Sequence, residues 1–352
     1  MDIELLKLRE QVLAAARGRR PLRVHGSGTK DFYAEAMQGA ALDVRSYRGI
    51  IDYEPTELVL TARCGTPLSE IDTILAEHDQ FLAFEPPAFG ADPTLGGIIA
   101  AGLSGPRRLQ VGAARDFVLG VSLLAADGEL LRFGGQVMKN VAGFDVSRLL
   151  CGSLGIFGIM ADLSLKVLPR PRAEATLRRP ASARAAIELF NRWGGRALPI
   201  SAAAWCEGNI WLRLSGALSA VRAAQASIGG DSVEANTAER WWSELRHLRH
   251  PVFANGSLWR ISVPQTTPLP PSPVPDLIDW GGAVRWYGGA CGELDPRRHA
   301  TEAGGIATRW RGAAPQGRFH PLTPAVREIH RRLKRSFDPL GIFNPGRLLA
   351  EL

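Results

Sequence analysis

A glycine-rich stretch in the middle of the chain, residues 152–158, has the composition of a backbone that must approach something closely. It reads Gly-Ser-Leu-Gly-Ile-Phe-Gly, so glycines alternate with bulky apolar residues. Glycine in a folded segment costs about 0.5–1 kcal/mol relative to alanine, so a cluster of glycines indicates a geometric need. One such need is close contact between the backbone and a large flat ligand. The alternative is a plain turn that feeds the strand predicted for residues 159–167.

Two further stretches could bind an anion through backbone N–H groups. Residues 25–30 (His-Gly-Ser-Gly-Thr-Lys) follow a short predicted strand, and small residues there can let consecutive N–H groups converge. A surface turn is the alternative, since the stretch is neither a Walker A loop nor a G-x-G-x-x-G fingerprint. Residues 92–105 place Thr94 before the pair Gly96-Gly97. They could wrap a pyrophosphate while Thr94 donates a hydroxyl, or they could form a tightly packed buried helix.

The elements that position these stretches follow from periodicity and turn chemistry. Leu5, Leu8 and Val12 fall on one face of a predicted N-terminal helix. The pair Asp127-Gly128 predicts a β-hairpin. Together with the strands around them, these features indicate a domain that mixes helices with a sheet.

A strand, a helix and a second strand are predicted between residues 58 and 84. The strands are residues 58–62 and 81–84, and the helix between them has Thr66 as its N-cap and Pro67 at its first helical position. A β–α–β unit of this kind favours an α+β or α/β sheet.

The composition changes after residues 169–171, where we place a domain boundary. From residue 173 to 235 the pattern predicts strand, helix, strand, strand, helix, strand, which is the order of a ferredoxin-like unit. Residues 258–263 and 283–287 predict strands that continue its sheet.

The C-terminal region combines an amphipathic helix with a tail of turn-forming residues. Val326, Ile329, Leu333 and Phe337 predict an apolar face on a helix at residues 324–337. Residues 338–347 (Asp-Pro-Leu-Gly-Ile-Phe-Asn-Pro-Gly-Arg) are too rich in turn formers for a fraying end. They predict a docked terminus.

Composition excludes several classes of function. The chain carries 42 basic and 35 acidic residues and four widely separated cysteines without a Cys-x-x-Cys pair. This arrangement supports neither a cysteine zinc site nor an iron–sulfur cluster, and it predicts reduced thiols in a cytoplasmic protein. The basic cluster at residues 327–335 could touch nucleic acid, or it could be a solvated helix face. No apolar run is long enough to span a bilayer or to serve as a signal peptide.

Four motifs carry a family resemblance, at residues 21–32, 93–105, 139–171 and 338–348. Their types and order resemble the FAD-binding oxidases of the vanillyl-alcohol oxidase/PCMH type, and most closely the GlcE-type FAD-binding subunits of bacterial glycolate oxidase. The resemblance covers nearly the whole chain. Its most specific parts are Lys-Asn-Val-Ala-Gly-Phe-Asp with Gly-Ser-Leu-Gly-Ile-Phe-Gly, and Phe-Asp-Pro-Leu-Gly-Ile-Phe-Asn-Pro-Gly-Arg-Leu near the end.

The resemblance implies an α+β fold of three parts. Residues 1–170 would form a PCMH-type FAD-binding domain of two α+β subdomains. Residues 171–310 would form a ferredoxin-like α+β cap over the substrate. Residues 311–352 would form a C-terminal segment that packs back on the FAD domain and returns to the flavin.

The resemblance also implies the residues that hold FAD. Those expected at the pyrophosphate are His25, Gly26, Ser27, Gly28 and Thr29 from the first loop, with Thr94, Gly96 and Gly97 on its other side. Those expected along the rest of FAD are Gly102, Gly105, Asp116, Phe117, Val118, Gly155, Gly158, Ile159 and Asn344. No histidine occupies the usual attachment position in the first loop, so FAD is expected to be non-covalent.

The chemistry implied by the resemblance is oxidation of a 2-hydroxy acid, glycolate to glyoxylate, by hydride transfer from C2 to flavin N5. Arg318 would clamp the substrate carboxylate and His320 would act as base, because a bidentate arginine and a histidine suit these roles. A surface or structural pair is the alternative for these two residues. The expected partners are a larger FAD subunit and an iron–sulfur subunit, and membrane contact is expected only through them, at the inner membrane.

Two departures from the family pattern leave other functions open. The cap lacks a His-x-Gly-Asp-Gly-Asn-x-His-like segment, so no metal site is expected, and Leu154 stands where relatives often carry an acidic residue. The alternatives are a non-catalytic FAD-fold scaffold of the same complex and a stand-alone oxidase of another hydroxy acid or a sugar. A basic nucleic-acid binder is a further alternative.

Overall fold

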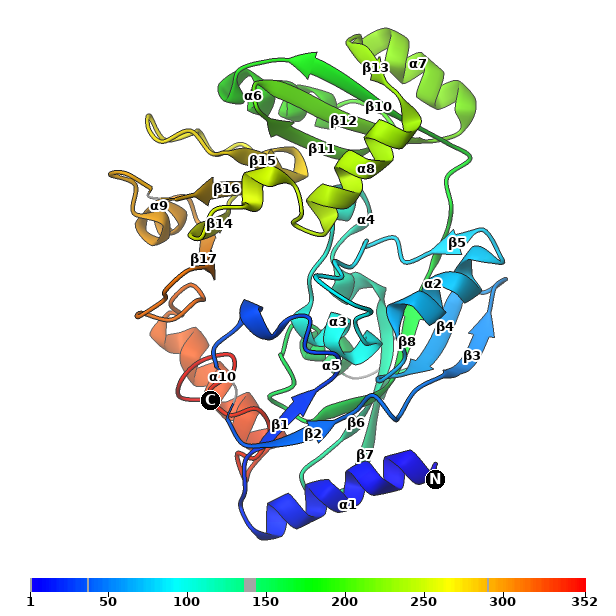
Figure 1. The fold of residues 1–352 in the computed structure, drawn as a ribbon, viewed down its shortest axis with the longest axis vertical. Helices are drawn as coiled ribbons and strands as arrows, with labels where there is room; N and C mark the ends of the chain where they lie inside the picture. The colour runs from blue at the N-terminus through cyan, green and yellow to red at the C-terminus, as the bar shows by residue number, and fades with distance from the viewer. Residues whose placement is uncertain (1, 37, 136–143, 290) are drawn as a thin grey trace. The chain divides into compact units, whose positions relative to one another are not determined.

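The computed structural model describes residues 2–36, 38–135, 144–289 and 291–352 (Figure 1). These residues form two compact units. The first comprises the described residues within 1–103, 113–169 and 321–352, and the second comprises those within 104–112 and 170–320. Residues 311–320 thus belong to the second unit. The division into an FAD-binding domain, a cap and a C-terminal segment, which was made from the sequence, stays a prediction.

The first unit is built on an antiparallel five-stranded sheet. Its order is β3 (Ile50–Glu54), β4 (Val59–Arg63), β8 (Ile159–Lys166), β6 (Val118–Leu124) and β7 (Leu130–Gly134). The glycine-rich stretch 152–158 leads directly into β8, so the strand predicted for 159–167 is confirmed. The Asp127-Gly128 hairpin is also confirmed, because β6 and β7 pair across it.

A smaller parallel sheet in the same unit joins both ends of the chain. It pairs β1 (Leu22–His25) with β2 (Ala40–Asp43), and Leu22 also bridges Phe343 of the tail. Helix α1 (Ile3–Arg17) buries Leu5, Leu8 and Val12 in the core that β1, β2, β6, β8 and the tail share. The predictions of an amphipathic first helix and of a docked terminus are therefore confirmed.

The prediction of a β–α–β unit at residues 58–84 is wrong, because its two strands do not lie in the same sheet. Helix α2 (Leu68–Ala76) is present, but the second strand is only β5 (Gln80–Phe81), and it pairs with β9 (Leu168–Pro169) instead of joining the main sheet. The predicted N-cap is wrong as well. Pro67 is the N-cap, and the Thr66 hydroxyl bonds to Gly49 because a distant loop offers it both a donor and an acceptor.

The second unit is built on an antiparallel eight-stranded sheet. The predicted order of strand, helix, strand, strand, helix, strand is confirmed. These elements are β10 (Ala173–Pro180), α6 (Ala183–Gly194), β11 (Ile200–Cys206), β12 (Asn209–Gly216), α7 (Leu218–Ile228) and β13 (Asp231–Val233).

Four further strands extend this sheet, which runs β13-β10-β12-β11-β15-β16-β14-β17. They are β14 (Leu258–Ser262), β15 (Leu277–Asp279), β16 (Val284–Gly288) and β17 (Ile306–Arg311). Helices α8 (Ala235–Arg246) and α9 (Pro296–Glu302) belong to the same unit, as does the short α4 (Arg108–Val111). The predicted continuation of the sheet is confirmed.

Helix α10 (Pro324–Phe337) has the predicted bounds but not the predicted buried face. Val326 is 39% exposed and Ile329 is 55% exposed, whereas the buried residue is Lys334. Phe337 does pack, with its ring centroid 5.3 Å from that of Phe157. The prediction is wrong for the first half of the helix because tertiary contacts, and not periodicity alone, select which turn is covered.

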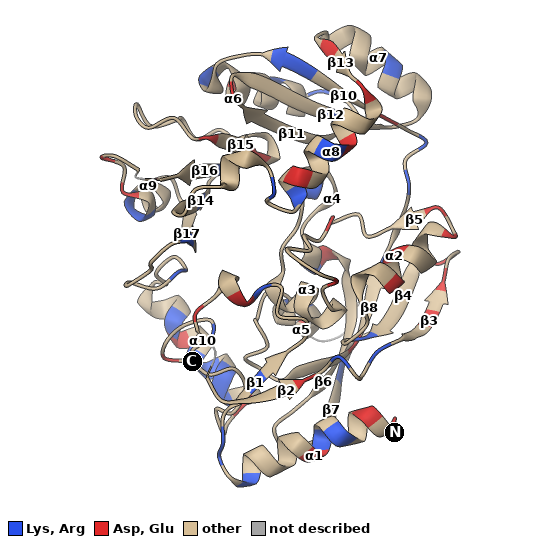
Figure 2. Cartoon of the chain, viewed as in Figure 1, with Lys and Arg blue, Asp and Glu red and all other residues tan. Residues whose placement is uncertain are grey.

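Figure 2 marks the Lys and Arg positions of α10 in blue. Arg327 pairs with Glu351, Arg332 pairs with Glu328, and Lys334 is buried. This pattern is that of a solvated and docked helix rather than a row of charges presented to a phosphate backbone. Among the described residues, no helix has the length and apolarity to cross a bilayer.

Candidate functional site

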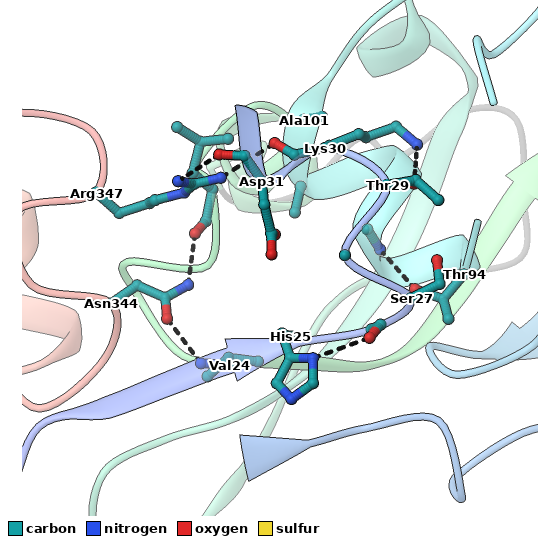
Figure 3. Close-up of a pocket in the computed structure, with 15 residues that line it drawn as sticks. Val24, His25, Ser27, Thr29, Lys30, Asp31, Thr94, Ala101, Asn344 and Arg347 are labelled. Carbon is teal, nitrogen blue, oxygen red and sulfur yellow. Dashed lines mark hydrogen bonds between the residues drawn. The ribbon is translucent and has the colours of Figure 1, made fainter. Parts of the chain in front are cut away.

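The loop after β1 lines a pocket (Figure 3). β1 ends at His25, and Gly28 adopts a left-handed φ of 72° that turns the chain. Within the described part of the chain, the N–H groups of residues 26–30 donate to no protein acceptor, whereas Asp31 N–H bonds to the carbonyl of Gly28. Because unpaired backbone donors in a concave turn attract an anion, this loop is a candidate phosphate site.

Helix α3 (Leu95–Ala101) forms the wall opposite this loop. Its first N–H groups are already bonded: Leu95 to the carbonyl of Thr66, Gly96 to that of Cys64, and Gly97 to the hydroxyl of Thr94 at 3.3 Å. Of the two alternatives for residues 92–105, a pyrophosphate-binding loop or a buried helix, the structure shows the buried helix. The N–H groups of residues 95–97 are therefore not free to bind a pyrophosphate.

Gly26 and Thr94 set how closely the loop approaches this helix. A Cβ atom built on Gly26 would lie 2.2 Å from Thr94 Oγ1, a distance that no side chain tolerates. Only glycine therefore allows the loop to lie against the helix, and this contact fixes the width of the space between the two walls.

The C-terminal tail closes the site from a third side. Val24 N–H donates to Asn344 Oδ1 at 2.7 Å, and Asn344 Nδ2 donates to the carbonyl of Leu154 at 2.7 Å. Arg347 donates to the carbonyl oxygens of Lys30 and Asp31. The tail thus holds the strand before the loop, the loop itself and the glycine-rich stretch in one arrangement.

Two adjoining hollows lie between these walls. One, of about 490 Å³, is lined by residues 24–31 together with Thr94, Gly97, Leu154, Asn344 and Arg347. The other, of about 400 Å³, shares His25, Gly26 and Asn344 with the first and continues past Cys64, Gly155 and Ile159.

The structure brings most of the sequence-predicted binding residues to these hollows. The lining residues among them are His25, Gly26, Ser27, Gly28, Thr29, Thr94, Gly96, Gly97, Gly155, Gly158, Ile159 and Asn344. Their role toward a ligand stays a prediction. The Asn344 amide lies here, but both its ends are used by backbone partners.

Five predicted binding residues do not line either hollow. Gly102 ends α3 with φ 63° against the backbone of Gly152. Asp116 accepts a bond from Ala113 N–H, and Phe117 and Val118 are buried at the start of β6. Gly105 belongs to the second unit. The first part of the motif at 139–171, residues 139–143, lies outside the described residues.

The predicted catalytic pair lies in the second unit, in structural contacts. Ala307 N–H donates to His320 Nδ1 at 3.2 Å, and His320 Nε2 lies 3.3 Å from Thr301 Oγ1. Burial, and then the charge of Arg297, lower the pKa of His320, which favours the neutral ring. Arg309 of β17 donates its N–H to the carbonyl of Arg318 at 2.7 Å, and Arg318 Nη1 donates to the carbonyl of Arg309 at 3.4 Å. A catalytic role for either residue stays a prediction.

Three polar residues of the first hollow were not among the predicted site residues: Lys30, Asp31 and Arg347. Lys30 follows the predicted loop directly, so the signal was a basic residue next to a row of small ones. Arg347 belongs to the tail motif, but nothing local in the sequence shows that its guanidinium reaches the loop more than three hundred residues earlier.

Comparison with known proteins gives the family. The chain is 46% identical over 346 residues to the glycolate oxidase subunit GlcE of Escherichia coli, which covers 98% of this chain and 97% of that protein. This chain belongs to the GlcE family of glycolate oxidase subunits. A family model described as an FAD binding domain matches residues 7–134, so this member of the GlcE family is an FAD-binding oxidoreductase subunit.

More distant relatives share parts of this GlcE-family chain or its fold. The glycolate oxidase subunit GlcD of Bacillus subtilis is 32% identical over 45% of this chain and 34% of its own length. A D-lactate dehydrogenase of Archaeoglobus fulgidus is 23% identical over 94% of this chain and 86% of its own length. A solved alkyldihydroxyacetonephosphate synthase superposes with a TM-score of 0.66 at 14% identity, covering 97% of this chain and 74% of that one, which shows the shared fold.

The site suits the diphosphate part of FAD. A dinucleotide of this kind offers an extended anionic group, and the loop at residues 26–30 offers N–H donors that have no acceptor among the described residues. The glycines at 26 and 155 allow the walls of the hollows to approach closely, because a Cβ atom would lie 2.2 Å from Thr94 Oγ1 at the first and 2.8 Å from Asn344 Nδ2 at the second. The residues of this GlcE-family chain therefore fit the cofactor of the family model.

Proposed function

We propose that this chain is the FAD-carrying subunit of a glycolate oxidase complex that oxidises glycolate to glyoxylate. The observation that carries the proposal is the 46% identity to the E. coli GlcE subunit over almost the full length of both chains. The loop of free N–H groups and the hollows beside it support the proposal independently, since an FAD subunit needs such a site.

In this proposal the residues of the first unit bind and orient the cofactor. The N–H groups of residues 26–30 hold the diphosphate, and Thr94 and Gly97 form the opposite wall. Glycines 155 and 158 let the backbone of the second hollow approach the remaining parts closely. When bound, FAD supplies a two-electron acceptor for the hydride equivalent that leaves C2 of a 2-hydroxy acid. The proposal takes the FAD to be bound without a covalent link to the chain.

The substrate side of the proposal assigns Arg318 to the carboxylate and His320 to the proton on the substrate hydroxyl. Arginine suits a bidentate carboxylate, and a neutral imidazole is the form of histidine that accepts a proton. The lowered pKa of His320 keeps it in that form. Its proton-accepting nitrogen, however, already accepts a bond from Ala307 N–H, so it must leave this partner to act as base.

A second candidate function is a scaffold or electron-relaying subunit that binds FAD without acting on substrate. The engagement of both His320 nitrogens with Ala307 and Thr301 favours it. In either case the partners would be a larger FAD subunit and an iron–sulfur subunit. The chain would then work in the cytoplasm, reaching the inner membrane only through these partners.

The test is the visible spectrum of the purified chain before and after anaerobic addition of glycolate. Flavin absorption bands that bleach with glycolate would place substrate chemistry on this subunit. Bands that persist alone but bleach after the partner subunits are added would support the relaying candidate. Acid precipitation should release the flavin into the supernatant if it is non-covalent. A chain that takes up no FAD would overturn the proposal.

A further inference from the structure

Lys30 carries a buried ammonium group. Its side chain is 8% exposed. Among the residues that the structure describes, no carboxylate oxygen lies within 4.0 Å of its Nζ atom. The contacts of Nζ are a 3.3 Å hydrogen bond to Thr29 Oγ1 and the face of the Phe89 ring, whose centroid is 5.8 Å away. An ammonium taken out of water with so little compensation is costly, so its presence requires a reason.

The position of Lys30 supplies such a reason. It is the last residue of the loop whose N–H groups find no acceptor in the described residues, and it lines the same hollow as the rest of that loop. Arg347 holds the carbonyl of Lys30 at 3.1 Å, which fixes the main chain there (Figure 3). The amides of the loop supply directed but uncharged donors, and Lys30 adds a full positive charge at one end of their row.

Thr29 links this charge to the hollow. Because Lys30 donates to Thr29 Oγ1, the hydroxyl hydrogen of Thr29 is left to donate elsewhere. The Thr29 side chain also lines the hollow, and its methyl group lies 3.4 Å from the position of a Cβ atom on Gly90. The ammonium and a neighbouring hydroxyl donor are thus held together at the loop.

The other charged groups near Lys30 do not neutralise it. His25, Asp31 and Arg347 line the same hollow, and the segment that places Phe89 over the ammonium also carries Glu85. Asp31 is exposed, and its carboxylate forms no ion pair with Lys30 within 4.0 Å. Burial lowers the pKa of Lys30 to about 8. Nearby anionic charge brought by a ligand would raise it again.

We propose that Lys30 is the charged ligand of the FAD diphosphate and the residue that makes this site select a dinucleotide over flavins without a diphosphate. The inference rests on the proposed function, since it takes FAD as the occupant of the hollow. It assigns to Lys30 a binding role that the backbone loop cannot fill, because amide donors alone carry no net charge.

Two consequences distinguish a binding role from a structural one. First, removal of a buried uncompensated charge should leave the FAD-free protein as stable as before or more stable, while a structural residue would lower its melting temperature. Second, FAD binding should take up a proton above about pH 8, where Lys30 of the free protein loses its charge. Affinity should then fall by about tenfold for each further pH unit until the pKa of the bound form is reached.

The test compares FAD, ADP and riboflavin binding to the FAD-free full chain by calorimetry, for wild type, Lys30→Met, Lys30→Arg and the surface control Lys7→Met. We expect Lys30→Met to weaken FAD and ADP roughly ten- to a hundredfold, with riboflavin unchanged. Lys30→Arg should retain most of the affinity and lose the pH dependence, because arginine stays protonated. Lys7→Met should match wild type, since that side chain is 58% exposed on α1.

Two results would overturn the inference while leaving the proposed function intact. One is Lys30→Met binding FAD like wild type, and the other is an equal loss of riboflavin and FAD with a lowered melting temperature. If Lys30→Met does not fold, the inference is tested by the pH dependence of FAD affinity in the wild type. An affinity that does not change with pH above about pH 8 would overturn the inference. A wild type that binds no FAD would instead overturn the proposed function itself.

Discussion

Lys334 and Asp338, one helical turn apart at the end of α10, form a buried ion pair with Nζ 2.7 Å from Oδ2. The ammonium also donates to the carbonyl oxygens of Ile156 at 2.6 Å and Phe343 at 2.8 Å. Asp338 in turn accepts from the N–H groups of Ile342 and Phe343. One pair of charges therefore fastens the C-terminal tail to the glycine-rich stretch that precedes β8.

Asp338→Asn should destabilise the first unit strongly. The substitution keeps the shape of the side chain but leaves the ammonium of Lys334 buried without an opposite charge, a loss of about 3–5 kcal/mol in the free energy of unfolding. Urea unfolding of the FAD-free chain measures it. Glu328→Gln is the matched control, because it breaks an exposed pair with Arg332 on the same helix and should change stability by less than about 1 kcal/mol. Equal effects of the two substitutions would contradict this account.

Asn344→Ala should loosen the junction between the tail and β1. It removes the bonds to Val24 and Leu154, and each buried partner left unpaired costs about 1–3 kcal/mol. Asn344 also has φ 41°, a left-handed conformation that alanine adopts less readily. We expect a lower melting temperature and weaker FAD binding. Asn209→Ala, which removes an exposed bond within the β11–β12 hairpin, serves as the control and should leave both nearly unchanged.

Gly26→Ala should disable the loop through a steric clash with Thr94. The new methyl group would lie 2.2 Å from Thr94 Oγ1, so the loop must move away from α3 and its N–H groups must diverge. We expect FAD affinity to fall at least about tenfold, measured by calorimetry. Gly256→Ala is the matched control, because its Cβ would meet nothing within 4 Å.

The double substitution Gly26→Ala with Thr94→Ala tests the cause of that loss. Removing Oγ1 and the methyl group of Thr94 relieves the closest contacts, leaving the Thr94 Cβ at 3.1 Å. The double variant should therefore bind FAD better than Gly26→Ala alone, even though it gives up the N-cap of α3. Purely additive losses would show that the two residues do not meet as the structure places them.

The stability of the first unit should depend on alkaline pH through Cys64. Burial raises the pKa of this thiol to about 12, whereas an unfolded thiol ionises near its usual value of 9.0. Between these values the folded state holds the proton that the unfolded state loses, so stability falls as pH rises, by about 1.4 kcal/mol per pH unit. Lys30 has the opposite effect on stability. Burial lowers its pKa to about 8, so above that pH the folded state loses a proton that the unfolded state still holds, and stability rises with pH.

Comparison with Cys64→Ala isolates the thiol from Lys30 and the other titrating groups. Wild type should lose stability faster than this variant between about pH 9 and pH 12 in urea unfolding, even if the variant is less stable at neutral pH. Parallel pH profiles for the two proteins would contradict the assignment of the slope to Cys64.

Local sequence rules predicted much of this fold because the forces they describe act over a few residues. The apolar face of α1, the Asp127-Gly128 hairpin and the strand and helix order of residues 173–235 depend on spacing and turn chemistry alone. The family motifs likewise identified the FAD-binding class, because the glycines needed for close backbone approach leave a pattern in the sequence.

The failures share one cause, which is a contact with a distant segment. Thr66 loses its predicted N-cap role to a bond with Gly49, and β5 pairs with β9 rather than with the main sheet. On α10 the amphipathic pattern predicted a buried apolar face, but the buried residue is Lys334, whose partners in the glycine-rich stretch lie almost 180 residues earlier. Periodicity reports which residues share a face and not which face another segment covers.

The sequence by itself determined that a row of small residues follows the first strand and that a turn-rich tail ends the chain. It left open whether the row binds an anion or forms a plain turn, and whether residues 92–105 offer their N–H groups to a ligand. Only the tertiary structure decided which donors are free: the first N–H groups of α3 are bonded to Cys64, Thr66 and Thr94, whereas those of residues 26–30 meet no acceptor in the part of the chain that the structure describes. The physical reason is that a donor's availability depends on acceptors brought near it by folding, which its own neighbours in the sequence do not specify.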